Sequence, residues 1–153
     1  MRRQDLPRME PGLSQEQYTQ LMHYNQGRTV GTLVERCGIE FLRMGYDWFE
    51  ARMPVEGNKQ PAGLFHGGAH VVMAETLGSM HAFLLANGHN VVGVDLNATH
   101  LRPIREGWVH GRAEVLHHGR TLISHEVKMT DGEGRLLSIV RITNFILAQR
   151  SQD

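Results

Sequence analysis

The spacing of apolar residues divides the chain into segments of different character. Over residues 14–36 apolar side chains recur every three or four positions, which predicts two short helices. Residues 39–53 alternate apolar and polar side chains, which predicts a hairpin. Residues 67–86 form an apolar stretch almost without charge, which predicts one buried helix about 30 Å long. The two-residue period then returns over residues 92–147 and predicts four strands.

This order of elements predicts the fold class. Short helices, a hairpin, one long helix and then antiparallel strands favour an α+β domain in which a sheet packs around the long helix. Residues 1–13 contain two prolines and mixed charges, so we expect a flexible N-terminal arm, and residues 14–150 form the single domain. A sheet curled over one helix leaves strand edges open, and we therefore expect an oligomer.

Composition narrows the possible partners and location. The 153 residues suffice for one domain, and 16 basic residues balance 16 acidic ones, so nothing points to nucleic acid or to an anionic membrane. No run approaches the roughly 20 apolar residues of a membrane span. Cys37 is the single cysteine and the N-terminus lacks the apolar core of a signal peptide. These features predict a cytoplasmic protein.

Glu75 is the candidate catalyst, because it is the only carboxylate between residues 67 and 86. An acid buried without a partner costs several kcal/mol, so it needs a partner or a chemical role. Ser79 lies one helical turn ahead on the same face. Gly67 and Gly68 begin the helix, where free N–H groups and the positive end of the helix dipole can form an oxyanion hole.

The loop before the helix carries the remaining candidates. Pro61 and Gly63 bend it, so that Gln60 and His66 can be presented near the start of the helix. Nine helical residues separate His66 from Glu75, about 13 Å, which is too far for direct contact. We therefore expect a site assembled from two subunits, with the loop of one facing the acid of the other.

Three sequence runs resemble a known family. They are QPAGLFHGGA over residues 60–69, AETLGS over residues 74–79 and VGVDLNATHLR over residues 92–102. Together they are similar to the hotdog-fold acyl-CoA thioesterases, in particular those acting on 4-hydroxybenzoyl-CoA, 1,4-dihydroxy-2-naphthoyl-CoA and phenylacetyl-CoA. The resemblance covers roughly residues 34–147.

The resemblance implies a role for each candidate. Glu75 would be the nucleophile or general base, the N–H of Gly67 would polarise the thioester carbonyl, and Gln60 would hold that carbonyl or the attacking water. His66 would orient the loop and aid the leaving thiolate, and Ser79 would touch the acyl group or water. Homodimers with shared active sites, assembling into homotetramers, are expected, without a cofactor, because coenzyme A belongs to the substrate. Its phosphates and pantetheine would contact Arg102, Arg105, Gly119, Arg120 and Thr121.

Other interpretations stay open for these residues. Glu75 can be a structural acid, His66 a helix cap, Ser79 core packing, and the arginines ordinary turn charges. His66 and His70 lie one turn apart, as metal ligands do, but a third ligand at compatible spacing is missing, so no metal is expected. A hotdog hydratase or dehydratase and a non-catalytic acyl-CoA-binding protein are the rival functions. The acyl group is open too, since the small Ala62 stands where close relatives often place an aromatic residue.

Overall fold

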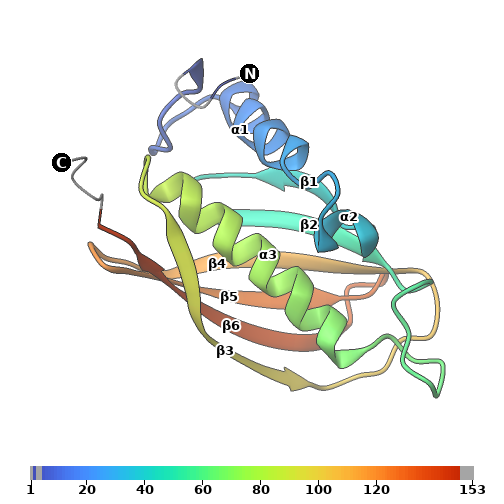
Figure 1. The fold of residues 1–153 in the computed structure, drawn as a ribbon. Helices are drawn as coiled ribbons and strands as arrows, with labels where there is room; N and C mark the ends of the chain where they lie inside the picture. The colour runs from blue at the N-terminus through green and yellow to red at the C-terminus, as the bar shows by residue number, and fades with distance from the viewer. Residues whose placement is uncertain (1, 3–4, 149–153) are drawn as a thin grey trace.

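A computed structural model describes residues 2 and 5–148 of the chain (Figure 1). The elements are three helices and six strands, in the following order: α1 Gln15–Gly27, α2 Leu33–Arg36, β1 Glu40–Met44, β2 Trp48–Pro54, α3 Gly67–Leu85, β3 Val91–His100, β4 Trp108–His118, β5 Leu122–Thr130 and β6 Leu136–Ile146. The α+β prediction is confirmed, as are the hairpin, the long helix and the four later strands.

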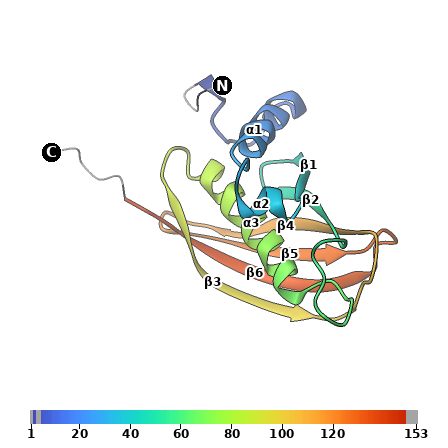
Figure 2. The same cartoon turned by 45° about the vertical axis from the view of Figure 1, so that its right-hand side comes forward.

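All six strands form one antiparallel sheet in the order β1-β2-β4-β5-β6-β3. The sheet curves around α3, which lies across its concave face (Figures 1 and 2). Because β3 follows α3 but pairs with β6, the last strand, the chain places β3 at one edge of the sheet and β1 at the other. This is the arrangement expected of a hotdog fold.

Glycines let α3 lie close to the sheet. A β-carbon at Gly78 would overlap the side chain of Ile142 on β6, and one at Gly111 on β4 would lie 3.1 Å from Met73 and 3.2 Å from Leu77. Met73 and Leu77 are themselves fully buried. Dense packing of this kind leaves no room for a larger residue at either glycine without displacement of the helix.

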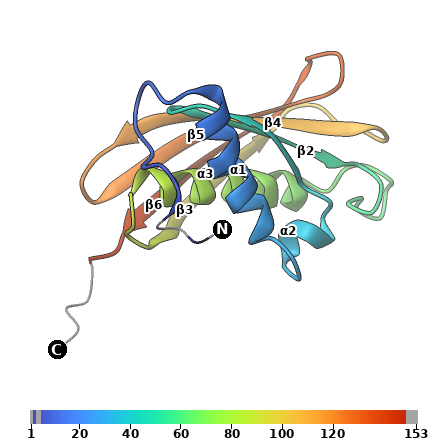
Figure 3. The same cartoon turned by 90° about the horizontal axis from the view of Figure 1, so that it is seen from above.

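The first helix packs beside β1, on the same side of the sheet as α3 (Figure 3). Ser14 caps it as predicted, since its hydroxyl accepts from the Gln17 N–H while the Gln17 side chain accepts from the Ser14 N–H. The second helix is shorter than predicted: it covers Leu33–Arg36, whereas the prediction was residues 30–36. Gly31, with a φ of +75°, holds a left-handed conformation that a helix cannot include.

Part of the N-terminal arm is anchored in this structure. Met9 is 3% exposed, its N–H donates to Asn87 Oδ1 at 2.9 Å, and Asn87 Nδ2 donates back to its carbonyl at 3.2 Å. The flexibility predicted for residues 1–13 stays a prediction, since it concerns motion. None of the helices described is long and apolar enough to cross a membrane.

Candidate active site

The loop before α3 is a tight turn centred on Gln60. Gly63, with a φ of +81°, donates its N–H to the Gln60 carbonyl at 2.9 Å. The Gln60 N–H donates to the Leu64 carbonyl at 2.8 Å. The side-chain oxygen of Gln60 accepts from the N–H of Ala62. This leaves the side-chain NH2 group of Gln60 as the donor that the loop can present to a ligand.

His66 is the N-cap of α3. Its Nδ1 accepts from the Gly68 N–H at 2.8 Å, so the neutral ring carries its proton on Nε2. The capping interpretation of His66 is therefore what the structure shows, and it leaves Nε2–H as a donor. The N–H of Gly67 lies in the first helical turn, where the helix itself provides no acceptor.

His100, at the end of β3, faces this helix start, and sequence reasoning missed it. A β-carbon at Gly67 would lie 2.7 Å from His100 Nε2. The ring is fixed from its other side, because His100 Nδ1 bonds the Ser138 hydroxyl at 2.9 Å and that hydroxyl donates to the Thr99 carbonyl at 3.1 Å. Since Ser138 has a single proton, Nδ1 must donate, and Nε2 presents a lone pair beside Gly67.

A cavity of about 280 Å³ opens at this point. It is lined by Gln60, Leu64, Phe65, Gly67, His70, His100, Leu101, Arg102, Pro103 and Ile104. His70 stacks on His100 with 5.3 Å between ring centroids and meets the Phe65 ring edge-on at 4.6 Å. Burial, and then the neighbouring His100, lower the pKa of His70 to about 4, so His70 itself is neutral at physiological pH.

Glu75 is not in this cavity but farther along α3. Contrary to the burial suggested by its apolar surroundings in the sequence, its side chain is exposed. Its Oε1 lies 3.0 Å from where a β-carbon of Gly93 would stand, so the carboxylate sits above β3. Ser79, one turn on, donates its hydroxyl to Asn144 Oδ1 on β6 at 2.8 Å. Within one chain, Glu75 and Ser79 therefore form one group, and Gln60, His66 and Gly67 another.

The residues expected to contact coenzyme A fall into two clusters. Arg102 lines the cavity at Gly67, and Arg105 Nη1 lies 3.4 Å from the Ala62 carbonyl of the neighbouring loop. Gly119, Arg120 and Thr121 instead border a groove of about 750 Å³ beside Leu85 and Ala86, at the other end of α3. One chain does not bring the two clusters together.

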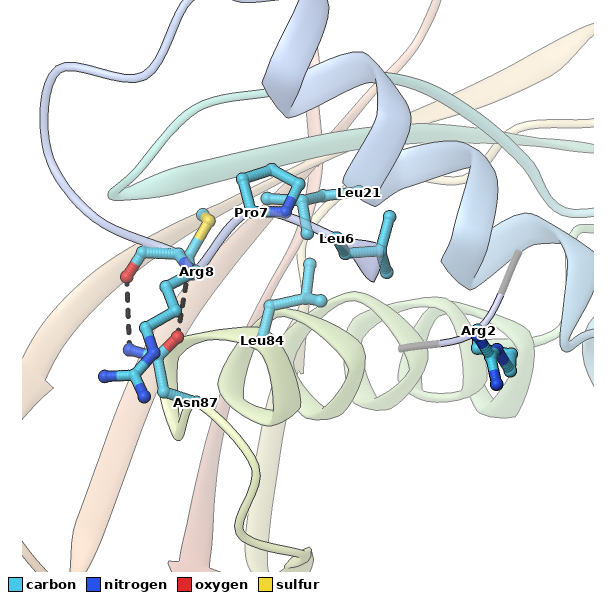
Figure 4. A pocket seen from close by; sticks show the side chains of 8 residues that line it. Arg2, Leu6, Pro7, Arg8, Leu21, Leu84 and Asn87 are labelled. Atoms are coloured by element: carbon cyan, nitrogen blue, oxygen red, sulfur yellow. Dashed lines mark hydrogen bonds between the residues drawn. The ribbon is translucent and has the colours of Figure 1, made fainter. Parts of the chain in front are cut away.

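Another cavity, of about 520 Å³, lies between the N-terminal segment, α1 and the end of α3 (Figure 4). Leu6, Leu21 and Leu84 point into it, and Asn87 closes it through its bonds to Met9. No residue predicted for the site lines it, so its volume does not bear on the chemistry.

Two residues that sequence reasoning missed have features in the sequence that could have identified them. His100 stands inside the 92–102 run, at the end of a strand, where a side chain is free to reach a helix terminus. Asn144 follows Val140 and Ile142 on the same face of β6, where these two apolar residues are almost fully buried. A polar residue at an apolar strand position indicates a bonded partner, which here is Ser79.

Comparisons with known proteins point to one family. A family model described as the thioesterase superfamily matches residues 62–138. The proofreading thioesterase EntH of Cronobacter turicensis is 43% identical over 121 residues, covering 78% of this chain and 88% of its own. The solved thioesterase HI1161 of Haemophilus influenzae is 37% identical with a TM-score of 0.80, covering 86% of this chain and 93% of its own.

Two further solved structures are variants of the thioesterase SAV0944 of Staphylococcus aureus. In one a glutamate, and in the other a glutamine, is replaced by alanine. They are 27% and 26% identical to this chain, cover 75% and 76% of it and 98% of their own length, and both have a TM-score of 0.72.

Proposed function

This chain belongs to the thioesterase superfamily, and within that family we propose that it hydrolyses an acyl-CoA to the free acid and coenzyme A. We propose further that the acyl group is aromatic, such as 4-hydroxybenzoyl or 1,4-dihydroxy-2-naphthoyl, and that Glu75 is the nucleophile or general base. The observation that carries the proposal is the exposed Glu75 carboxylate above Gly93, beside an open strand edge.

The relatives support these two residues through their spacing. The glutamate and the glutamine replaced in the two SAV0944 variants stand 15 positions apart in that protein, the same spacing that separates Gln60 from Glu75. An equal spacing is what we expect if the two side chains occupy matching places in the fold. This match favours a joint role for Gln60 and Glu75.

The two edges of the sheet favour a homodimer through β3. At the β1 edge, the N–H of Phe41 donates to Gln26 Oε1 of α1 at 3.1 Å, so the helix occupies that edge. Among residues 2 and 5–148, none covers the ten-residue β3 edge in this way, and the edge exposes Val92 (43%) and Val94 (57%). A long edge strand with exposed apolar side chains is a template for pairing with a second copy.

Antiparallel pairing of two β3 strands would assemble a complete site. Glu75 lies over Gly93, near the start of β3, whereas Gly67 lies against His100, at its end. When a two-fold axis relates two paired β3 strands, the start of one strand lies beside the end of the other. Glu75 of one subunit would then face the Gly67 cavity of its partner, as the helical distance from His66 predicted. Assembly of two dimers into a homotetramer stays an expectation.

The same antiparallel pairing would bring the two clusters predicted to contact coenzyme A close together. Arg102 and Arg105 border the start of α3, and Gly119, Arg120 and Thr121 border its end. Two antiparallel chains bring the start of one helix toward the end of the other, so clusters from different chains become neighbours. We propose that these arginines bind phosphate and that the turn offers N–H and hydroxyl donors.

Two chemical routes are compatible with this site. Glu75 can attack the thioester carbon, so that the C–S bond breaks and a mixed anhydride forms, which water then hydrolyses. Alternatively, Glu75 takes a proton from a water that attacks the carbon directly. In both routes the Gly67 N–H and the Gln60 amide stabilise the oxyanion, and His66 Nε2–H can donate to the leaving thiolate. His100 Nε2 offers an acceptor for a water or a substrate hydroxyl.

Release of free thiol tests the proposal. We expect the purified protein to release thiol from 4-hydroxybenzoyl-CoA or 1,4-dihydroxy-2-naphthoyl-CoA faster than from fatty acyl-CoAs, and Glu75→Ala to abolish turnover. Consumption of an enoyl-CoA with its thioester intact would instead indicate the hydratase, and tight binding without turnover the acyl-CoA-binding protein. Equal rates on fatty and aromatic thioesters would reject the aromatic preference.

Single-turnover hydrolysis in labelled water separates the two routes. Label recovered in the Glu75 carboxylate would support nucleophilic attack, and label found only in the product acid would support the general base. The cytoplasmic location suggested by the sequence stays a prediction.

A further inference from the structure

Asn144 is a buried polar residue without an assigned role. It is 0% exposed and lies on the buried face of β6, two positions beyond Ile142, which is 1% exposed. Its Oδ1 accepts the Ser79 hydroxyl at 2.8 Å, but its Nδ2 is buried and has no hydrogen-bond partner in the described part of the chain. A buried donor without an acceptor is unfavourable, so its retention calls for a partner that it meets in another arrangement.

The acid of the proposed site lies next to this amide. Gly93 is the direct partner of Asn144 in the β3–β6 ladder. A β-carbon at Gly93 would lie 3.0 Å from Glu75 Oε1 and 3.8 Å from Asn144 Oδ1, so both side chains border the space over Gly93. The absence of a side chain at Gly93 leaves space in which the carboxylate can move toward the amide.

We propose that Asn144 is a positioning residue for Glu75, holding the Ser79 hydroxyl through Oδ1 and donating Nδ2–H to the Glu75 carboxylate as this settles over Gly93. The contact gives the buried donor its missing acceptor. It also holds the exposed acid in one conformation at the β3 edge, where the proposed reaction needs it. The inference rests on the proposed role of Glu75 in thioester hydrolysis.

Substitutions that separate the donor from the acceptor test this role. Asn144→Leu removes both functions of the amide, whereas Asn144→Asp keeps an acceptor for Ser79 but sets a carboxylate against Glu75. We expect kcat for acyl-CoA hydrolysis to fall about tenfold in the Leu variant and at least as far in the Asp variant, with KM changed less than about twofold. A purely structural role predicts the opposite order, because Asp is the closer replacement in shape and keeps the bond to Ser79.

A second pair guards against loss of folding. Asn144→Thr and Asn144→Val have the same shape and both suit a strand, but only Thr offers an O–H donor. The proposal predicts a kcat several-fold higher for Thr than for Val at equal far-UV circular dichroism. Equal rates for Thr and Val, or near wild-type kcat for the Asp variant, would overturn it.

Two controls make the outcome specific. Asn25 is also 0% exposed and also has an unpartnered side-chain atom, so Asn25→Leu should lower the melting temperature and leave kcat unchanged. Glu75→Gln tests the underlying function. If Glu75→Gln retains full turnover, the proposed function fails, whereas an inactive Glu75→Gln beside unaffected Asn144 variants rejects the positioning role alone.

Discussion

Helix α3 makes two histidine contacts with the sheet, and they have opposite surroundings. Near its start, His70 stacks on His100 of β3 at 5.3 Å between ring centroids, beside the cavity at Gly67. Farther along, His81 lies 5.1 Å from His125 of β5, and both rings are 0% exposed. The residue types and the distances are nearly the same, so they cannot decide the role of either pair.

The difference lies in what the other ring nitrogens reach. His100 presents Nε2 to the cavity and the helix N-terminus. Both ring nitrogens of His81 have hydrogen-bond partners. Nδ1 bonds His125 Nε2 at 2.9 Å, and Nε2 bonds the Gly45 carbonyl at 3.2 Å. The His70–His100 contact thus borders an opening near the β3 edge, whereas the His81–His125 contact is sealed in the core. The position of a histidine along α3, more than its residue type, therefore distinguishes a candidate site residue from a core residue.

The largest effect should come from the buried face of α3. Leu77 is 0% exposed and packs against Gly111, so Leu77→Ala should lower the free energy of unfolding by about 2 to 5 kcal/mol. Glu75→Gln, two positions away but exposed, should change it by less than about 0.5 kcal/mol. Urea unfolding of both variants at one chain concentration makes the comparison. A Leu77→Ala cost below about 1 kcal/mol would mean that this face is not sealed.

A substitution at Gly67 tests the open region at the start of α3. A valine there would push its β-carbon to within 2.7 Å of His100 Nε2, displacing the ring and blocking approach to the N–H. We expect kcat/KM for acyl-CoA hydrolysis to fall about a hundredfold, the usual effect of losing one oxyanion donor. The matched control is Gly27→Val at the end of α1, where an added β-carbon meets nothing within 4 Å. Equal activity of the two variants would remove Gly67 from the site.

The sealed histidines should make the fold sensitive to acid. Burial lowers the pKa of His81 to about 4, although its bond to Gly45 opposes the shift, and burial followed by His81 lowers that of His125 to about 3. Above pH ~6.5 both folded and unfolded chains hold them neutral. As the pH falls from there toward 4, only the unfolded chain takes up protons, so the free energy of unfolding falls by up to about 1.4 kcal/mol per pH unit for each histidine.

Replacing both rings tests the origin of this slope. The double variant His81→Leu and His125→Leu should show a flatter dependence of urea midpoint on pH between 6.5 and 4. The exposed His23→Gln of α1 serves as the control and should keep the wild-type slope. If the double variant loses stability in acid as steeply as the parent, the slope has another source.

Much of the fold was predictable from local patterns. The capping box at Ser14, the two-residue period of the strands and the apolar run of α3 each reflect short-range rules, and each was confirmed. The second helix was overextended because Gly31 takes a positive φ that apolar spacing does not reveal. Boundaries of this kind depend on single backbone conformations.

The site was predictable only in part. The sequence singles out Glu75, but its exposure follows from its place over β3, an edge strand of the sheet, which is a property of topology. His100 and Asn144 are 25 and 69 positions from Glu75, and only strand pairing places them near α3. His66 was considered as a helix cap, and the structure shows the bond that it accepts from the Gly68 N–H.

Mixing two impaired variants tests most directly whether sites are shared between subunits. We expect the Glu75→Ala chain to be inactive alone and the Gly67→Val chain to keep about a hundredth of the wild-type activity. If Glu75 of one subunit serves the Gly67 cavity of the other, unfolding and refolding an equimolar mixture should restore about a quarter of wild-type thiol release, because half of the dimers are mixed and each has one intact site. No recovery from mixed dimers, shown to have formed by two affinity tags, would contradict the shared site.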